Sequence, residues 1–167
     1  MLFNSVPFLL FFLTTLVVYR TAPLGWRGRK LWLLAASWSF YASWSPRFLA
    51  LLVLTTWIDF QLARGIYRLR FRDARPAAAR LGLIASLVLN LGVLALLKYG
   101  RFLWEAAGAV GSAMPAPAWL AVVAPLGVSF YTFHSISYVV DTYRGLRPPT
   151  DDFPDFALYV AFFPQLI

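Results

Sequence analysis

One apolar segment carries several side chains that could take part in proton transfer. Residues 125–145 read PLGVSFYTFHSISYVVDTYRG. On a helix with about 100° per residue, Tyr131, His134, Tyr138 and Asp141 share one narrow sector with Gly127, and Ser135 and Ser137 flank it. Imidazole, phenol and carboxyl groups suit acid–base chemistry or the binding of a hydroxylated substrate. Leu, Val, Ile and Phe fill the opposite arc, so the segment has two chemically different faces.

This polar face has two interpretations. Polar groups at membrane depth are costly unless they are paired or face a cavity, so the face is predicted to turn toward the interior of a helix bundle. There it either lines a polar cavity for a substrate or bonds to neighbouring helices. His134 is the only His in the chain, and Asp141 lies about two helical turns away. No acid within one turn could orient the imidazole, which argues against a catalytic His134.

Composition indicates whether this segment lies in water or in a lipid bilayer. Hydrophobic residues make up 60% of the 167 residues and charged residues only 13%, whereas soluble domains are about half apolar and a quarter charged. The sequence therefore predicts an all-α, polytopic transmembrane helix bundle. The net charge of +8 comes from Arg residues in short loops between apolar runs, a pattern typical of membrane topology and not of nucleic-acid binding. The absence of Cys excludes disulfides and a thiol nucleophile.

The apolar runs predict one membrane domain over residues 1–167. The expected spans are 2–19, 31–44, 47–63, 81–97 and 119–140, followed by a helix over 156–167 that is too short to cross. Residues 31–63 could form one long span or a hairpin. A hairpin turning at Ser45-Pro46 puts both flanking basic loops on the same side, as the positive-inside rule requires. This topology places the N-terminus outside and loop 141–155 in the cytoplasm.

Other charged and small residues also suggest contacts. Asp59 precedes Arg64 by about one turn, so it is predicted to pair with a loop Arg. The basic cluster from Arg64 to Arg80 is predicted to contact anionic lipid headgroups. Two series of small residues recur every four positions: Ala35, Ser39 and Ser43, and Gly82, Ser86 and Asn90. Such spacing permits close helix packing, although small residues are also common in membrane helices for no such reason.

Several segments resemble one family in the order in which the family has them. PLGVSFYTFHSISYVVDTYRG is similar to the signature of the bacterial membrane-bound O-acyltransferases, in the branch of the alginate O-acetylation protein. MLFNSVPFLLFF, SWSFYASWSPRFLALLVLTTWIDF, LNLGVLALLKYGRF and FFPQLI resemble further blocks of this family. The resemblance implies that the chain is the N-terminal portion of a larger O-acyltransferase fold.

The resemblance also implies a chemistry and a location. Such an enzyme moves an acyl group, usually acetyl, from acetyl-CoA or another activated acyl carrier onto hydroxyls of an exported polysaccharide such as alginate. It lies in the bacterial inner membrane, with extracytoplasmic polysaccharide-modifying partners and no bound cofactor or metal. The catalytic His of the family lies downstream of the matched region, so no catalytic residue is expected in this chain. His134 does not correspond to that His, and Tyr131, His134, Tyr138 and Asp141 remain candidates for the wall of the substrate cavity.

Two other functions fit the same features. A transporter or flippase for a lipid-linked sugar would also need polar groups and broken helices within the membrane. A non-enzymatic membrane scaffold of a polysaccharide export complex is the third alternative. Further spans with an intramembrane His would support the enzyme, whereas a second half repeating the first in inverted topology would support the transporter.

Overall fold

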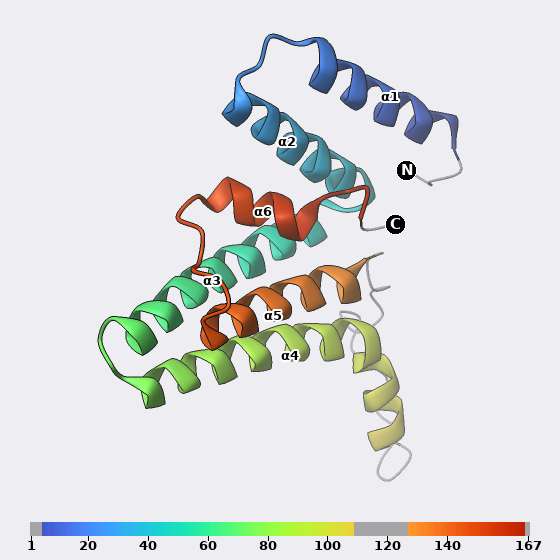
Figure 1. The fold of residues 1–167 in the computed structure, drawn as a ribbon. Coiled ribbons are helices and arrows are strands. Elements are labelled where there is room, and N and C mark those ends of the chain that lie inside the picture. Colours follow the sequence, from blue (N-terminus) through green and yellow to red (C-terminus); the bar gives the residue numbers. More distant parts are fainter. Residues whose placement is uncertain (1–4, 109–126, 166–167) are drawn as a thin grey trace.

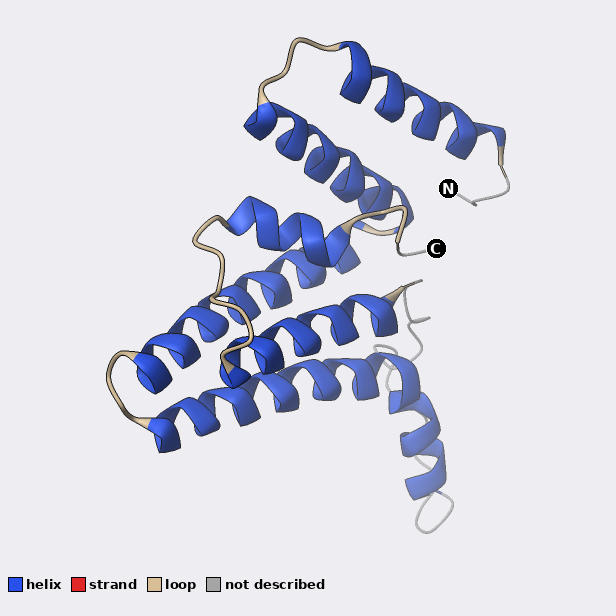
Figure 2. Ribbon diagram, viewed as in Figure 1, coloured by secondary structure: helices blue, strands red, loops and turns tan. Residues whose placement is uncertain are grey.

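The computed structural model describes residues 5–108 and 127–165, and every regular element in them is a helix (Figure 2). The helices are α1 (Val6–Thr21), α2 (Trp26–Trp44), α3 (Pro46–Phe71), α4 (Pro76–Gly108), α5 (Val128–Arg144) and α6 (Phe153–Ala161). This confirms the all-α prediction. Residues 1–4, 109–126 and 166–167 lie outside the described part of the chain. The first eight residues of the predicted span 119–140 are among them.

Local sequence fixes most helix starts. Pro occupies the first turn of α1, α3 and α6, where its missing N–H removes no helical hydrogen bond. The Ser5 hydroxyl caps α1 by accepting a hydrogen bond from the Phe8 N–H at 3.4 Å. Ser45 is extended (φ −161°, ψ 121°) between the end of α2 and Pro46. The predicted hairpin break at Ser45-Pro46 is therefore confirmed.

Several helix bounds differ from the predicted spans. Helix α3 continues to Phe71 and α4 begins at Pro76, because Arg and Ala are good helix formers even beyond an apolar run. At 1.5 Å per residue these helices exceed a bilayer core of about 30 Å, so their ends reach the aqueous phase. Helix α6 ends at Ala161, not at residue 167, because the chain turns at Pro164.

The three central helices α3, α4 and α5 pack on one another, and α6 lies against α2 and α3 (Figure 1). Helix α1 packs on α2 at the periphery, and the last turns of α4, drawn yellow, bend away from the bundle. An aromatic cluster fastens the outer helices, since Phe163 contacts Phe11 of α1 at 5.4 Å and Phe40 of α2 at 5.9 Å between ring centroids.

Helix α4 is polar inside and apolar outside. Its buried residues include Ser86 and Asn90, whereas its exposed side includes large apolar side chains three to four residues apart: Leu81, Ile84, Val88 and Leu91. A surface helix of a soluble protein has the opposite arrangement. Among the described residues, α3 and α4 are long and apolar enough to cross a membrane, and α1 is apolar but shorter. Together these features define an all-α membrane helix bundle.

The basic residues gather at one end of this bundle. The α1–α2, α3–α4 and α5–α6 connections lie at the same end, drawn at the left of Figure 1, and the α2–α3 corner lies at the other. Twelve of the 15 Lys and Arg residues lie in these three connections or within about two helical turns of them, and the other three are Arg47, Lys98 and Arg101. The hairpin prediction requires the basic loops on both sides of residues 31–63 to lie at the same end of the bundle, as they do here.

Candidate functional site

The buried face of α5 differs in direction from the predicted polar sector. Its buried residues are Val128, Tyr131, Thr132, Ser135, Val139 and Thr142. The face is thus centred on Ser135, so of the four cavity candidates only Tyr131 points fully into the bundle. Hydroxyl side chains of α5 therefore face the interior of the bundle, whereas His134, Tyr138 and Asp141 are partly exposed.

Two tyrosines of the predicted face pack in the central core. Tyr131 is 3% exposed and belongs to a cluster with Tyr41, Leu52 and Phe156. Tyr138 is half-buried, and its ring lies on that of Phe156 with 4.5 Å between centroids. The Tyr138 hydroxyl accepts a hydrogen bond from the Thr150 N–H at 2.8 Å. Tyr138 therefore ties α5 to the segment that leads into α6.

His134 lies between two aromatic rings at the α5–α6 contact. Its ring is 4.3 Å from that of Phe130 and 5.1 Å from that of Tyr159, with the second pair stacked. Its Nδ1 is 3.4 Å from the Tyr159 carbonyl oxygen, so a protonated Nδ1 would donate to that oxygen. This packing gives the imidazole a structural role whether or not it also meets a substrate.

The sequence predicted that Asp141 begins the loop 141–155, and this is wrong, because Asp141 belongs to the last turn of α5. Its carbonyl accepts a hydrogen bond from the Leu146 N–H at 3.1 Å, and the Thr142 carbonyl accepts one from the Gly145 N–H at 3.1 Å. With Gly145 at φ +78°, these bonds form a Schellman motif. The helix therefore ends at a fixed point, with the Asp141 side chain at the basic end of the bundle.

A carboxylate buried between three helices is the most polar feature of the core. Asp59 of α3 is 0% exposed. Its Oδ1 accepts hydrogen bonds from the Ser86 hydroxyl at 2.8 Å and from the Asn90 Nδ2 at 2.9 Å, and its Oδ2 is also 2.9 Å from Asn90 Nδ2. The side chain of Ser135 in α5, which is buried, lies beside this carboxylate. Asp59, Ser86, Asn90 and Ser135 are hereafter the buried polar cluster.

The buried polar cluster corrects the predicted pairing of Asp59 with a loop Arg. Arg64 instead pairs with Asp151, with 3.4 Å between Nη2 and Oδ1. One helical turn separates Asp59 from Arg64 along the chain, but the Asp59 side chain points between helices and Arg64 points to the exposed end. An acid in one apolar run and an Asn in the next could have indicated this contact, because intramembrane polar groups seek each other.

The two series of small residues differ in whether they face a neighbouring helix. Ser86 and Asn90 face α3, and a Cβ on Gly82 would come within 2.9 Å of Ile66 Cγ1, so this series permits close packing of α3 on α4. Close packing is thus confirmed for Gly82, Ser86 and Asn90, while Ala35, Ser39 and Ser43 lie on the exposed side of α2.

Ion pairs fasten the start of α6 and the connection before it to two other helices. Lys30 of α2 donates to Asp155 and lies 3.5 Å from Asp152, and Arg64 of α3 reaches Asp151. The hydrogen bond to Asp155 raises the pKa of Lys30, which precedes the predicted span 31–44, above its ordinary value. The raised pKa means that the Lys30 contribution is present at neutral pH and is lost as pH rises through that pKa.

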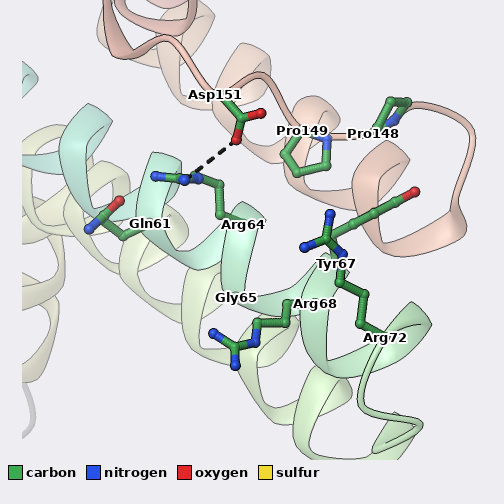
Figure 3. Close-up of a pocket in the computed structure, with 9 residues that line it drawn as sticks. All are labelled: Gln61, Arg64, Gly65, Tyr67, Arg68, Arg72, Pro148, Pro149 and Asp151. Atoms are coloured by element: carbon green, nitrogen blue, oxygen red, sulfur yellow. Dashed lines mark ion pairs between the residues drawn. The ribbon is translucent and has the colours of Figure 1, made fainter.

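Beside this connection lies a polar hollow of about 500 Å³ (Figure 3). It is lined by Gln61, Arg64, Gly65, Tyr67, Arg68 and Arg72 of the α3 end and by Pro148, Pro149 and Asp151 of the loop. In Figure 3, Arg64 and Arg72 extend toward the loop, whereas Arg68 extends away from it. This hollow, with the lining residues just named, is hereafter called the basic pocket. No group of three or more potential metal ligands is found among the residues described.

The fold and the buried polar cluster define a multi-helix membrane protein, and its sequence relatives narrow the class. The chain is 36% identical over 170 residues to a protein of Azotobacter vinelandii named probable alginate O-acetylase, and 37% identical to that of Pseudomonas aeruginosa. Both alignments cover the whole chain but only 33% and 32% of the relatives. A peptidoglycan O-acetyltransferase of Helicobacter pylori is 31% identical over 96% of the chain and 36% of its own length.

These relatives confirm the resemblance to the bacterial alginate O-acetylation branch of the membrane-bound O-acyltransferases. The chain spans about a third of the length of the curated relatives that it matches. No family model matches the sequence, and no solved structure matches the fold.

Proposed function

We propose that the chain is part of a membrane-embedded O-acyltransferase that transfers acetyl groups to hydroxyls of an exported polysaccharide. The observation that carries this proposal is similarity along the whole chain to proteins named for O-acetylation of alginate and of peptidoglycan. Both names describe transfer of an acetyl group to a hydroxyl of a sugar polymer. The acyl donor is acetyl-CoA or another activated acyl carrier.

The proposed protein lies in the bacterial inner membrane with its N-terminus outside. This orientation follows from the basic end of the bundle, which the positive-inside rule places in the cytoplasm. A donor made in the cytoplasm and a polymer exported from it would then approach the enzyme from opposite sides. Extracytoplasmic proteins that modify the same polysaccharide are the expected partners. At the basic end, the cluster from Arg64 to Arg80 contacts anionic lipid headgroups.

The chain itself supplies scaffold and cavity wall in this proposal. Tyr131, His134, Tyr138 and Asp141 line or brace the cavity in which the polymer hydroxyl meets the acyl donor. Their contacts support bracing most directly for Tyr138, which holds the loop before α6, and for His134, which stacks on Tyr159. The buried polar cluster holds the three central helices in register beneath them.

Paired substitutions in the complete protein test this role. His134→Phe keeps an aromatic ring against Phe130 and Tyr159, while His134→Ala removes it. If the imidazole meets substrate, both variants lose at least about tenfold in acetyl transfer, the scale of one well-placed polar contact. Polysaccharide acetyl content in cells measures the outcome, with protein abundance in the membrane as the control. Full activity of His134→Phe, with loss only in His134→Ala, would show that His134 acts through ring packing and not through contact with the substrate.

A further inference from the structure

We propose that the basic pocket binds the phosphate group of a ligand, with Arg64 and Arg72 as its principal contacts. This goes beyond the proposed contact of residues 64–80 with lipid headgroups, because it assigns a defined site in place of a diffuse charged surface. The pocket lies between the end of α3 and the loop 145–152, at the end of the bundle that carries most of the basic residues.

Sequence spacing puts the Arg residues in the pocket. Arg64 and Arg68 are four residues apart near the end of α3 and so start from one side of the helix, and Arg72 directly follows the last residue of α3. Arg68 lies 3.5 Å from Asp73 and extends away from the loop in Figure 3. Arg64 and Arg72 extend toward the loop, and Gln61 and Tyr67 bring further donors to the same hollow.

The form of the pocket suits a group of moderate size. Its volume of about 500 Å³ is in the range of small-molecule sites. A Cβ on Gly65 would meet nothing within 4 Å, so the helix side of the pocket is open. The opposite wall contains Pro148 and Pro149, whose fixed φ angles limit backbone movement. Guanidinium groups bind phosphate oxygens in pairs, and two of them can match the two charges of a phosphomonoester.

Asp151 makes the pocket selective. Its carboxylate lies 3.4 Å from Arg64, and its side chain is 93% exposed. Exposed ion pairs of this kind are weak, so a phosphate with a higher charge can replace the carboxylate at Arg64. A weakly charged anion gains less from the exchange. Asp151 thus acts as an internal competitor, and its removal should strengthen ligand binding.

Two sources could supply the phosphate: the headgroup of a membrane lipid or a soluble phosphate ester. The complete protein is therefore placed in nanodiscs of phosphatidylcholine with or without phosphatidic acid, and lipid retention is measured by native mass spectrometry. In parallel, the protein in neutral detergent is titrated with inorganic pyrophosphate. Selective retention of phosphatidic acid identifies a lipid site, and pyrophosphate binding without it identifies a soluble ligand.

Charge-matched variants decide whether the pocket is the site. The double variant Arg64→Gln/Arg72→Gln should lose about tenfold or more in affinity for the probe that binds. Arg27→Gln, at the start of α2, removes a positive charge at the same end of the bundle, outside the Arg64–Arg80 cluster and without lining the pocket, and should change affinity less than about twofold. Asp151→Asn should raise affinity, a gain that misfolding cannot produce.

Three results would overturn the proposal: binding of neither probe by the wild type, an equal loss in Arg27→Gln, or unchanged affinity in the double variant. Acetyl transfer is not part of the measurement. A negative result therefore leaves the proposed acyltransferase activity to its own test.

Discussion

At the scale of single residues, the buried polar cluster is the feature with the highest energetic stake. Asp59 of α3 is fully buried against α4 and α5, and its carboxylate accepts hydrogen bonds from two side chains of α4, Ser86 and Asn90. A buried carboxylate that loses a donor keeps its desolvation cost, so each donor matters more than a surface hydrogen bond. The cluster also specifies which faces of α3, α4 and α5 meet.

Asn90→Ala should lower the free energy of unfolding of the complete protein by about 2 kcal/mol, because hydrogen bonds to charged groups are worth about 1.5–3 kcal/mol. Denaturant unfolding in mild detergent measures the change. Ser39→Ala, on the exposed side of α2, is the control and should have little effect. An Asn90→Ala protein as stable as the control would show that Asp59 does not depend on the hydrogen bond from Asn90.

At the scale of elements, glycine determines where α5 starts and stops. Gly127 (φ +79°) precedes the helix, and Gly145 (φ +78°) ends it in the left-handed region that other residues enter at a cost. The stop at Gly145 directs the chain along α3, where Pro148, Pro149 and Asp151 complete the basic pocket. It also brings Gly145 against the ring of Phe71. One turn thus links the candidate cavity face to the proposed phosphate site.

Gly145→Ala should destabilise the protein by about 1–2 kcal/mol, the cost of a left-handed backbone for a residue with a Cβ. The added Cβ would also come within 2.7 Å of Phe71 Cζ, which forces that ring to move. Unfolding measurements should show the opposite sign for Gly92→Ala, since a Cβ there meets nothing within 4 Å in the interior of α4. Equal stability of the two variants would contradict the assigned role of the turn.

At the scale of the whole molecule, charge and shape agree on a direction across the membrane. The connections that carry most Lys and Arg residues share one end of the bundle, and the short α2–α3 corner lies at the opposite end. Helices α3 and α4 are long enough to join the two ends through a bilayer core. The donor side of the proposed reaction is then the basic end.

Single Cys residues can test this direction, because the chain has no native Cys. In a Cys-free form of the complete protein, Ala74→Cys in the α3–α4 connection should react with a membrane-impermeant maleimide only after the cytoplasmic side is opened. Ser45→Cys at the α2–α3 corner should react in intact spheroplasts, since it lies at the opposite end. Reaction of both positions from the same side would contradict the membrane-crossing arrangement of α3.

The sequence by itself determined that the chain is a membrane protein, that it is helical and that a hairpin turns at Ser45-Pro46. Apolar runs, Pro at helix starts and the distribution of Arg act locally or along the chain, so they can be read without knowing which helices touch. Helix ends were predicted less well, because Arg and Ala extend α3 and α4 beyond their apolar runs.

Only the tertiary structure decided which side of α5 faces inward and what Asp59 contacts. A helical sector shows which residues share a face, but neighbouring helices decide which part of that face is covered. Ser135 is therefore buried at Asp59, while His134 lies at α6. The basic pocket likewise needs both α3 and a loop about 80 residues further along the chain. Contacts between distant segments depend on packing, which the order of residues alone does not display.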